Sequence, residues 1–126
     1  MPHVILEYTD NLSSHTDIQL LVEDINQVLA KKNETYPIGG IRVRAYETNY
    51  YSIADGNEDD AFLHATVKIG KGRSGKEKEE TCEDVFSVMT SHFNEYTNNH
   101  YLALSLELIE FQHRTYKMNN IHARFK

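Results

Sequence analysis

The sequence has no tryptophan, a single cysteine and no long hydrophobic run. The lone cysteine, Cys82, excludes an internal disulfide and a zinc site built on cysteines. No stretch approaches the ~20 apolar residues of a membrane span, so no membrane partner is expected. The first residues lack both a basic segment and a long apolar one. This argues against a signal peptide and favours a cytoplasmic location.

An excess of basic charge is also lacking, because 19 Asp and Glu outnumber 13 Lys and Arg. The formal net charge is -6 at pH 7. A nucleic-acid partner is therefore not expected, since such proteins present a basic face. An anionic substrate needs a local cluster of Arg or Lys, because the overall field of the protein repels it.

Recognised metal and nucleotide motifs are missing as well. The seven histidines are scattered, with none of the i and i+4 pairs that bind zinc on a helix. Residues 70–73 contain two glycines but fit neither a Walker loop nor a dinucleotide fingerprint. We therefore expect neither a metal nor a cofactor.

What is present suits one globular domain over residues 1–126, with 40% hydrophobic and 25% charged residues. Helical spacing after Ser14, the expected cap, predicts a helix that ends near residues 31–33. Ser74 and Glu77 have the spacing of a capping box and predict a second helix that ends at residues 98–99, with Cys82 on its apolar face. Apolar or alternating patterns predict strands over residues 4–8, 41–46, 60–69 and 101–109, with a short extra strand over 49–54.

The order strand, helix, strand occurs twice, which predicts a duplicated βαβ unit. Each crossover pairs its two strands in parallel. We expect an α+β fold in which both helices cover one face of a four-stranded mixed sheet. The other face is then uncovered, and an apolar uncovered face favours oligomerisation.

Pro2 is the first candidate for chemistry. Methionine is normally removed before a residue as small as proline, which leaves a secondary amine at the start of the chain. Termini are usually frayed, and this amine is then idle in water. The strand expected immediately after Pro2 favours a fixed amine instead. Burial or a nearby guanidinium lowers the pKa of an α-amino group from ~7.7–8.0, which suits a general base near neutral pH.

Three arginines are candidates for binding carboxylates. Arg42 and Arg44 project from the same face of a predicted strand. They form either a solvated face or a paired guanidinium site, which grips carboxylates bidentately. Arg73 precedes the second helix, whose N-terminus attracts anions. It is either a further carboxylate ligand or a solvent-facing residue in a glycine turn.

These residues resemble those of the 5-carboxymethyl-2-hydroxymuconate isomerases, which belong to the tautomerase superfamily. The similarity runs essentially from end to end. It is carried by residues 1–3, 10–11, 40–44, 54–56, 60–64, 72–74, 104–105 and 117–126.

The resemblance implies the tautomerase fold, a homotrimer, and a tail over residues 111–126 that packs on a neighbouring subunit. It also implies a cofactor-free ketonisation of a dienol in the bacterial degradation of homoprotocatechuate, an aromatic acid. The family's proton carrier maps onto Pro2 and its arginines onto Arg42 and Arg73, with Arg44 as a third. The substrate is then a small enol with two or three carboxylates.

The chain departs from the family near its middle, where Tyr46 and the pair Tyr50 and Tyr51 stand in place of expected tryptophans. Tyr46 and Tyr51 are candidates for lining the substrate pocket. Two alternatives stay open: another proline-dependent tautomerase of unsaturated 2-hydroxy or 2-oxo acids, and a non-catalytic trimeric binding protein on the same scaffold.

Overall fold

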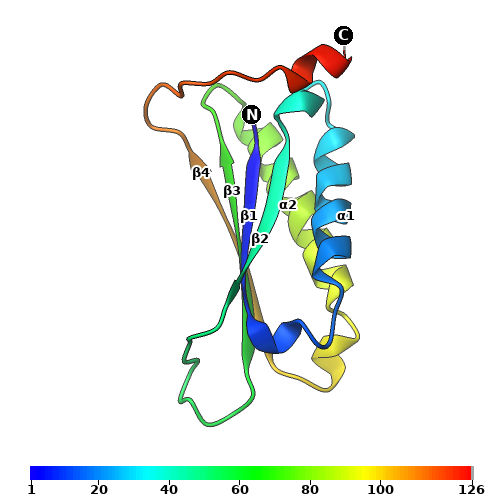
Figure 1. Cartoon of the computed structure of the whole chain (residues 1–126), viewed down its shortest axis with the longest axis vertical. Coiled ribbons are helices and arrows are strands. Elements are labelled where there is room, and N and C mark those ends of the chain that lie inside the picture. Colours follow the sequence, from blue (N-terminus) through cyan, green and yellow to red (C-terminus); the bar gives the residue numbers. More distant parts are fainter. Residues whose placement is uncertain (126) are drawn as a thin grey trace.

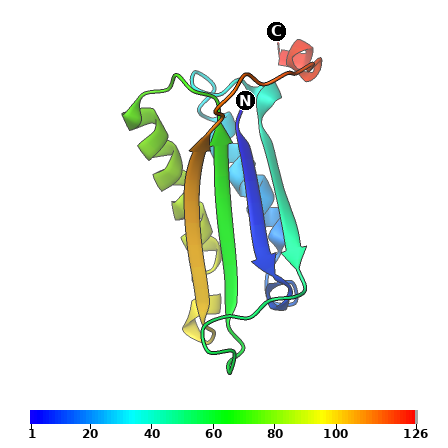
Figure 2. The same ribbon diagram turned by 90° about the vertical axis from the view of Figure 1, so that its left-hand side faces the viewer.

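The chain folds into two layers, a sheet and a pair of helices on the same side of it, as Figure 1 and Figure 2 show. The structure is a computed structural model that describes residues 1–125, so the end of the predicted tail, Lys126, lies outside it. The strands and helices are β1 (His3–Thr9), α1 (Ile18–Ala30), β2 (Arg42–Thr48), β3 (Ala61–Ile69), α2 (Gly75–His92) and β4 (Leu102–Glu110).

The sheet has the strand order β2-β1-β3-β4. Strand β1 is parallel to β2, and β3 is parallel to β4, while the central pair β1 and β3 is antiparallel. Helix α1 connects the first parallel pair and α2 connects the second. This arrangement confirms the duplicated βαβ unit and the mixed sheet with both helices on one face.

The core lies between the sheet and the helices. Alternate residues of β3 point into it, so that Ala61, Leu63, Ala65, Val67 and Ile69 are buried as their spacing predicts. The helices contribute residues four apart along one face. These are Leu21, Ile25 and Leu29 in α1 and Thr81, Val85 and Met89 in α2.

The two helix starts differ in how well the sequence predicted them. In α2 the capping box of Ser74 and Glu77 is confirmed, with both reciprocal hydrogen bonds present. In α1 the predicted cap, Ser14, is wrong, because Asp17 is the N-cap and accepts a hydrogen bond from the Leu20 amide. Helix α2 ends at His92, six residues before the predicted end, and a separate 3-10 turn follows.

The uncovered face of the sheet is not the apolar surface that we expected. The register places Arg42, Arg44 and Tyr46 beside His3, Ile5 and Glu7 on this face. On the other side of β1, His64, Thr66 and Lys68 continue it. The same face also carries Phe62, Ala103 and Ile109, so it is mixed rather than uniformly apolar.

One further segment differs from the expected secondary structure, and the end of the tail forms a short turn that no pattern predicts. Residues 49–54 form no strand and lie in a loop, where the Tyr51 hydroxyl donates to Asp10 Oδ1 at 2.9 Å. The end of the tail forms a 3-10 turn, η4 (Ile121–Phe125), which packs on another such turn, η2 (Ile38–Gly40), of the same chain. Asn119 Nδ2 donates to the Gly39 carbonyl at 2.8 Å and fixes this contact.

The contact between η2 and η4 depends on the absence of a side chain at Gly39. A Cβ at Gly39 lies 2.9 Å from the Cα and backbone nitrogen of His122. We expect Gly39→Ala to displace η4 and to destabilise the fold by ~1–3 kcal/mol, as overpacking does. Limited proteolysis of the tail and thermal unfolding measure this effect.

Gly75→Ala is the matched control, because a Cβ there meets nothing within 4 Å. Equal proteolysis of the Gly39→Ala protein and the parent would contradict the prediction.

None of the helices among residues 1–125 is both long and apolar enough to cross a membrane.

Candidate active site

The start of the chain is built into the sheet rather than frayed. Pro2 is buried, and its carbonyl accepts a hydrogen bond from the Arg42 amide at 3.0 Å. This bond extends the β1–β2 ladder by one step beyond His3, which pairs with Arg42. Removal of Met1 would therefore leave the Pro2 nitrogen held at the end of a strand.

The terminal amine lies among cations contributed by three parts of the chain. In the structure this amine belongs to Met1, and its pKa is lowered from the ordinary value of 8.0 to about 6. Burial is the largest cause, followed by the charges of Arg73, Lys117 and Arg42, in that order. Both effects disfavour the ammonium form, so the free amine predominates at neutral pH.

Arg73 is held in place by backbone carbonyls. Its Nε and Nη2 donate to the Thr35 carbonyl at 3.3 and 3.1 Å, and its Nη1 donates to the Gly70 carbonyl at 3.1 Å. The guanidinium also lies 4.6 Å from the ring centroid of Tyr36, a cation–π distance. Gly72 permits the turn before Arg73, because its φ of 115° is open to glycine and strained for other residues.

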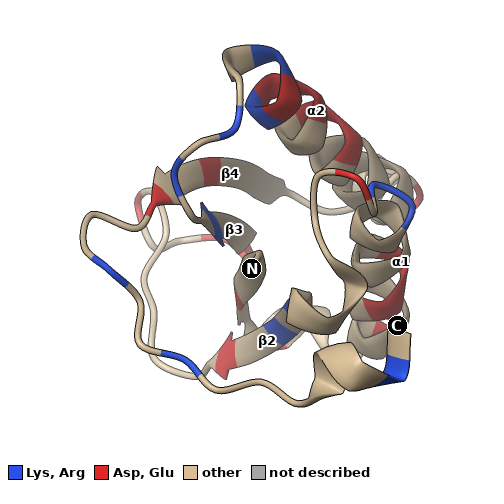
Figure 3. Ribbon diagram, turned by 90° about the horizontal axis from the view of Figure 1, so that it is seen from above, with Lys and Arg blue, Asp and Glu red and all other residues tan. Residues whose placement is uncertain are grey.

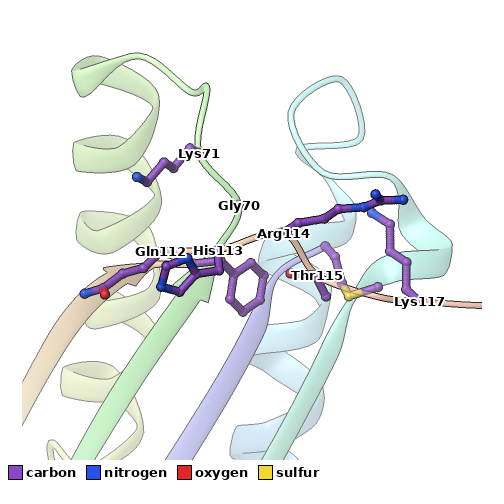
Figure 4. Close-up of a pocket in the computed structure, with 9 residues that line it drawn as sticks. Gly70, Lys71, Gln112, His113, Arg114, Thr115 and Lys117 are labelled. Atoms are coloured by element: carbon purple, nitrogen blue, oxygen red, sulfur yellow. The ribbon is translucent and has the colours of Figure 1, made fainter.

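A pocket of about 440 Å³ opens beside the terminal residue, and Figure 4 shows its lining. The loop after β3 and the tail after β4 form its walls. The lining residues are Met1, Gly70, Lys71, Phe111, Gln112, His113, Arg114, Thr115 and Lys117. Seen from above in Figure 3, the tail passes around the N-terminus and carries basic residues.

Arg42 and Arg44 differ in their surroundings although they share a face. Arg42 Nη1 donates to the Gly40 carbonyl at 3.2 Å, next to the terminal residues. Arg44 lies two residues further along β2, where its Nη1 is 3.1 Å from Nδ1 of His3. Burial first and then the Arg44 charge lower the pKa of His3, so this imidazole is neutral and suited to accept from Arg44.

The structure does not bring Tyr46 and Tyr51 to the terminal amine within one chain. Tyr46 pairs with Glu7 in the second half of β1, and its side chain is 59% exposed. Tyr51 contacts Asp10, which follows the last residue of β1. At about 3.3 Å a residue, the length of β1 separates Tyr51 from Pro2 by roughly 25 Å.

Sequence reasoning missed two residues of this region. Lys117 was one of the tail residues that carried the resemblance, but its place beside the amine depends on how the tail folds back. Tyr36 is fully buried under Arg73, and its hydroxyl lies 2.8 Å from Thr81 Oγ1. No pattern marks either residue.

Among residues 1–125, no cluster of three or more His, Cys, Asp or Glu is arranged to bind a metal ion.

Comparison with known proteins identifies the family to which this site belongs. A sequence profile of 5-carboxymethyl-2-hydroxymuconate isomerase matches residues 2–125. The chain belongs to the 5-carboxymethyl-2-hydroxymuconate isomerase family. It is 38% identical to the 5-carboxymethyl-2-hydroxymuconate Delta-isomerase of Escherichia coli over 128 residues, with all of both chains covered. The resemblance inferred from the sequence is confirmed, and the protein is an isomerase.

Solved structures agree with this family and with the wider fold. The crystal structure of a 5-carboxymethyl-2-hydroxymuconate isomerase from Deinococcus radiodurans R1 superposes with a TM-score of 0.95 at 45% identity, covering 99% of this chain and 94% of that one. A fused 4-OT protein, described as a symmetric trimer, superposes with a TM-score of 0.60 at 15% identity, covering 86% of each chain. At that identity the second likeness shows the fold alone.

Proposed function

We propose that this chain catalyses the cofactor-free ketonisation of 5-carboxymethyl-2-hydroxymuconate, with the terminal nitrogen of Pro2 as acid and base after Met1 is removed. The observation that carries the proposal is the amine of Met1, one residue before Pro2, which lies beside a pocket and among three cations that lower its pKa. General-base catalysis is most effective when the pKa of the base lies near the working pH, here close to 7.

The proposed reaction is a proton shift within one bound substrate. The neutral Pro2 nitrogen removes the proton of the 2-hydroxyl group, and the substrate becomes a dienolate. The same nitrogen, now a prolinium, then delivers this proton to a carbon of the dienolate. An α,β-unsaturated ketone results, and the amine is neutral again for the next turnover.

Arg42 and Arg73 would stabilise the negative charge that develops on the substrate oxygen and would bind the carboxylate beside it. Such electrostatic stabilisation is greatest from groups that are already fixed before the reaction. The carbonyl contacts of Arg73 support this role, because they use three of its five N–H groups and leave two for a substrate. Arg44 would act one step further along β2, on a more distant carboxylate.

We also propose that the protein works as a homotrimer in the degradation of homoprotocatechuate. The fused 4-OT neighbour described as a symmetric trimer supports the assembly by analogy of fold. Tyr46 and Tyr51 lie too far from Pro2 in their own chain, so in this proposal they line the pocket of a neighbouring copy. Tyr116 and Met118 of the tail are exposed, do not line the pocket of their own chain, and are available to pack across the same boundary.

The pH dependence of turnover tests the proton carrier. We expect kcat/KM to fall as the pH drops through a value well below 8.0, near the value of about 6 that this environment gives to the Met1 amine. The sign follows from the lowered pKa, because the amine is protonated and inactive below it and neutral above it. Loss of the enol absorbance in the ultraviolet follows turnover, and NMR titration of the terminal nitrogen assigns the pKa.

Two outcomes would count against the proposal. A terminal nitrogen that titrates near 8 would mean that the amine is not tuned for this role. Absence of turnover with 5-carboxymethyl-2-hydroxymuconate, together with activity toward other unsaturated 2-hydroxy acids, would favour a related proline-dependent tautomerase.

A further inference from the structure

We propose that Lys117, assisted by Arg114, forms a carboxylate subsite that selects substrates with a third carboxylate group. This inference rests on the proposed function, because it concerns the same pocket. It assigns to the C-terminal tail a specificity-determining role that is separate from the proton transfer at Pro2.

The first support is the position of the tail, which is anchored on both sides of Lys117. At one side the Phe111 amide donates to the Ile69 carbonyl at 2.8 Å, and the Lys68 amino group lies 5.4 Å from the Phe111 ring centroid. At the other side Asn119 Nδ2 is bonded to the Gly39 carbonyl. The segment between these anchors lies beside the terminal residue, because both line the same pocket.

The second support is the charge of the pocket. Its lining includes Lys71, Arg114 and Lys117 and no Asp or Glu, although the whole chain has a net charge of -6. Within residues 1–125 none of these three cations takes part in an ion pair. Lysines elsewhere do so, for example Lys32 with Asp84 at 2.6 Å. A local excess of positive charge in an acidic protein is what an anionic ligand requires.

The third support is the arrangement of the two tail cations. In Figure 4 the side chains of Arg114 and Lys117 extend toward one another from the tail. Like charges that converge without a carboxylate repel each other, and an anion between them would relieve this repulsion. Lys117 is also close enough to the terminal amine for its charge to lower the pKa of that amine.

The substrate named by the family has the matching chemistry. A muconate carries two carboxylates, and the carboxymethyl arm adds a third. Arg42 and Arg73 lie nearest the reacting end in the proposed mechanism, so the arm requires a further cation. Lys117 supplies that cation from a different wall of the pocket.

The test compares two substrates that differ only in this arm. We expect Lys117→Met to raise KM for 5-carboxymethyl-2-hydroxymuconate by ~10-fold, the lower range for a hydrogen bond to a charged group. KM for 2-hydroxymuconate, which lacks the arm, should change by less than ~2-fold on the same scale. Lys117→Arg keeps the charge and should restore most of the affinity. Lys31→Met, a change of the same kind at the end of α1, is the control.

Calorimetry separates this inference from the proposed function, because it needs no turnover. Tricarballylate, a tricarboxylate, should bind the parent protein more tightly than glutarate, and Lys117→Met should remove the difference. That result supports the subsite even in a protein that shows no isomerase activity. Equal effects of Lys117→Met on both acids and on both substrates, or no effect on any, would overturn the subsite and leave the proposed function standing.

Discussion

A chain that retains Met1 in front of Pro2 is expected to lose turnover by at least ~10²-fold, the lower range for removal of a general acid–base group. In that chain the Pro2 nitrogen is an amide and has no basic lone pair. The Met1 amine is still present, with a pKa of about 6. It is displaced from the Pro2 nitrogen by one residue, a step of about 3.8 Å between Cα atoms. The loss would therefore show that placement of the base matters as well as its pKa.

Intact mass spectrometry must confirm which form is present before kcat/KM is compared. Pro2→Ala is the matched control, because removal of Met1 then leaves a primary amine at the same position. We expect this variant to keep partial activity. Full activity of the form that retains Met1 would refute the role of the Pro2 nitrogen.

Most of the fold was predictable because its signals are local. The five buried residues of β3 alternate in the sequence, and the capping box of Ser74 and Glu77 contains both of its partners within four residues. The predicted cap at Ser14 failed because η1 (Asp10–Leu12) and a turn occupy the chain before α1, which leaves Asp17 at the N-cap. The strand predicted at 49–54 failed because side-chain contacts with Asp10 hold this segment as a loop.

The site was predictable only where local pattern and family resemblance agreed. Pro2, Arg42 and Arg73 converge on one end of the sheet, since Pro2 precedes β1, Arg42 begins the adjacent β2 and Arg73 follows β3. The uncovered face was predicted in part, because the sequence places Arg42 and Arg44 on one face of β2 but does not show that this face points away from the helices. Lys117 could not be placed, because no periodicity predicts the path of the tail.

Arg73→Ala is expected to lower kcat/KM by ~10²–10³-fold, the range for loss of one fixed donor to a developing oxyanion. Arg73 is also the charge that lowers the pKa of the terminal amine most after burial. Its removal should therefore move the acid limb of the pH profile upward, toward 8.0. Arg73→Lys keeps a charge but loses the planar fork, so it should restore the position of the limb more fully than kcat/KM.

A structural effect must be separated from this electrostatic one. Arg73→Ala also leaves the carbonyls of Thr35 and Gly70 without their donor, at ~1–3 kcal/mol for each group that stays buried. Thermal unfolding measures that loss, and kinetics are then compared at a temperature where each variant is folded. Tyr36→Phe keeps the ring under the guanidinium and removes only the hydroxyl bonded to Thr81, so it should lower stability without moving the acid limb. An acid limb that stays in place in Arg73→Ala would mean that burial alone tunes the amine, and that Arg73 acts on the substrate or the fold.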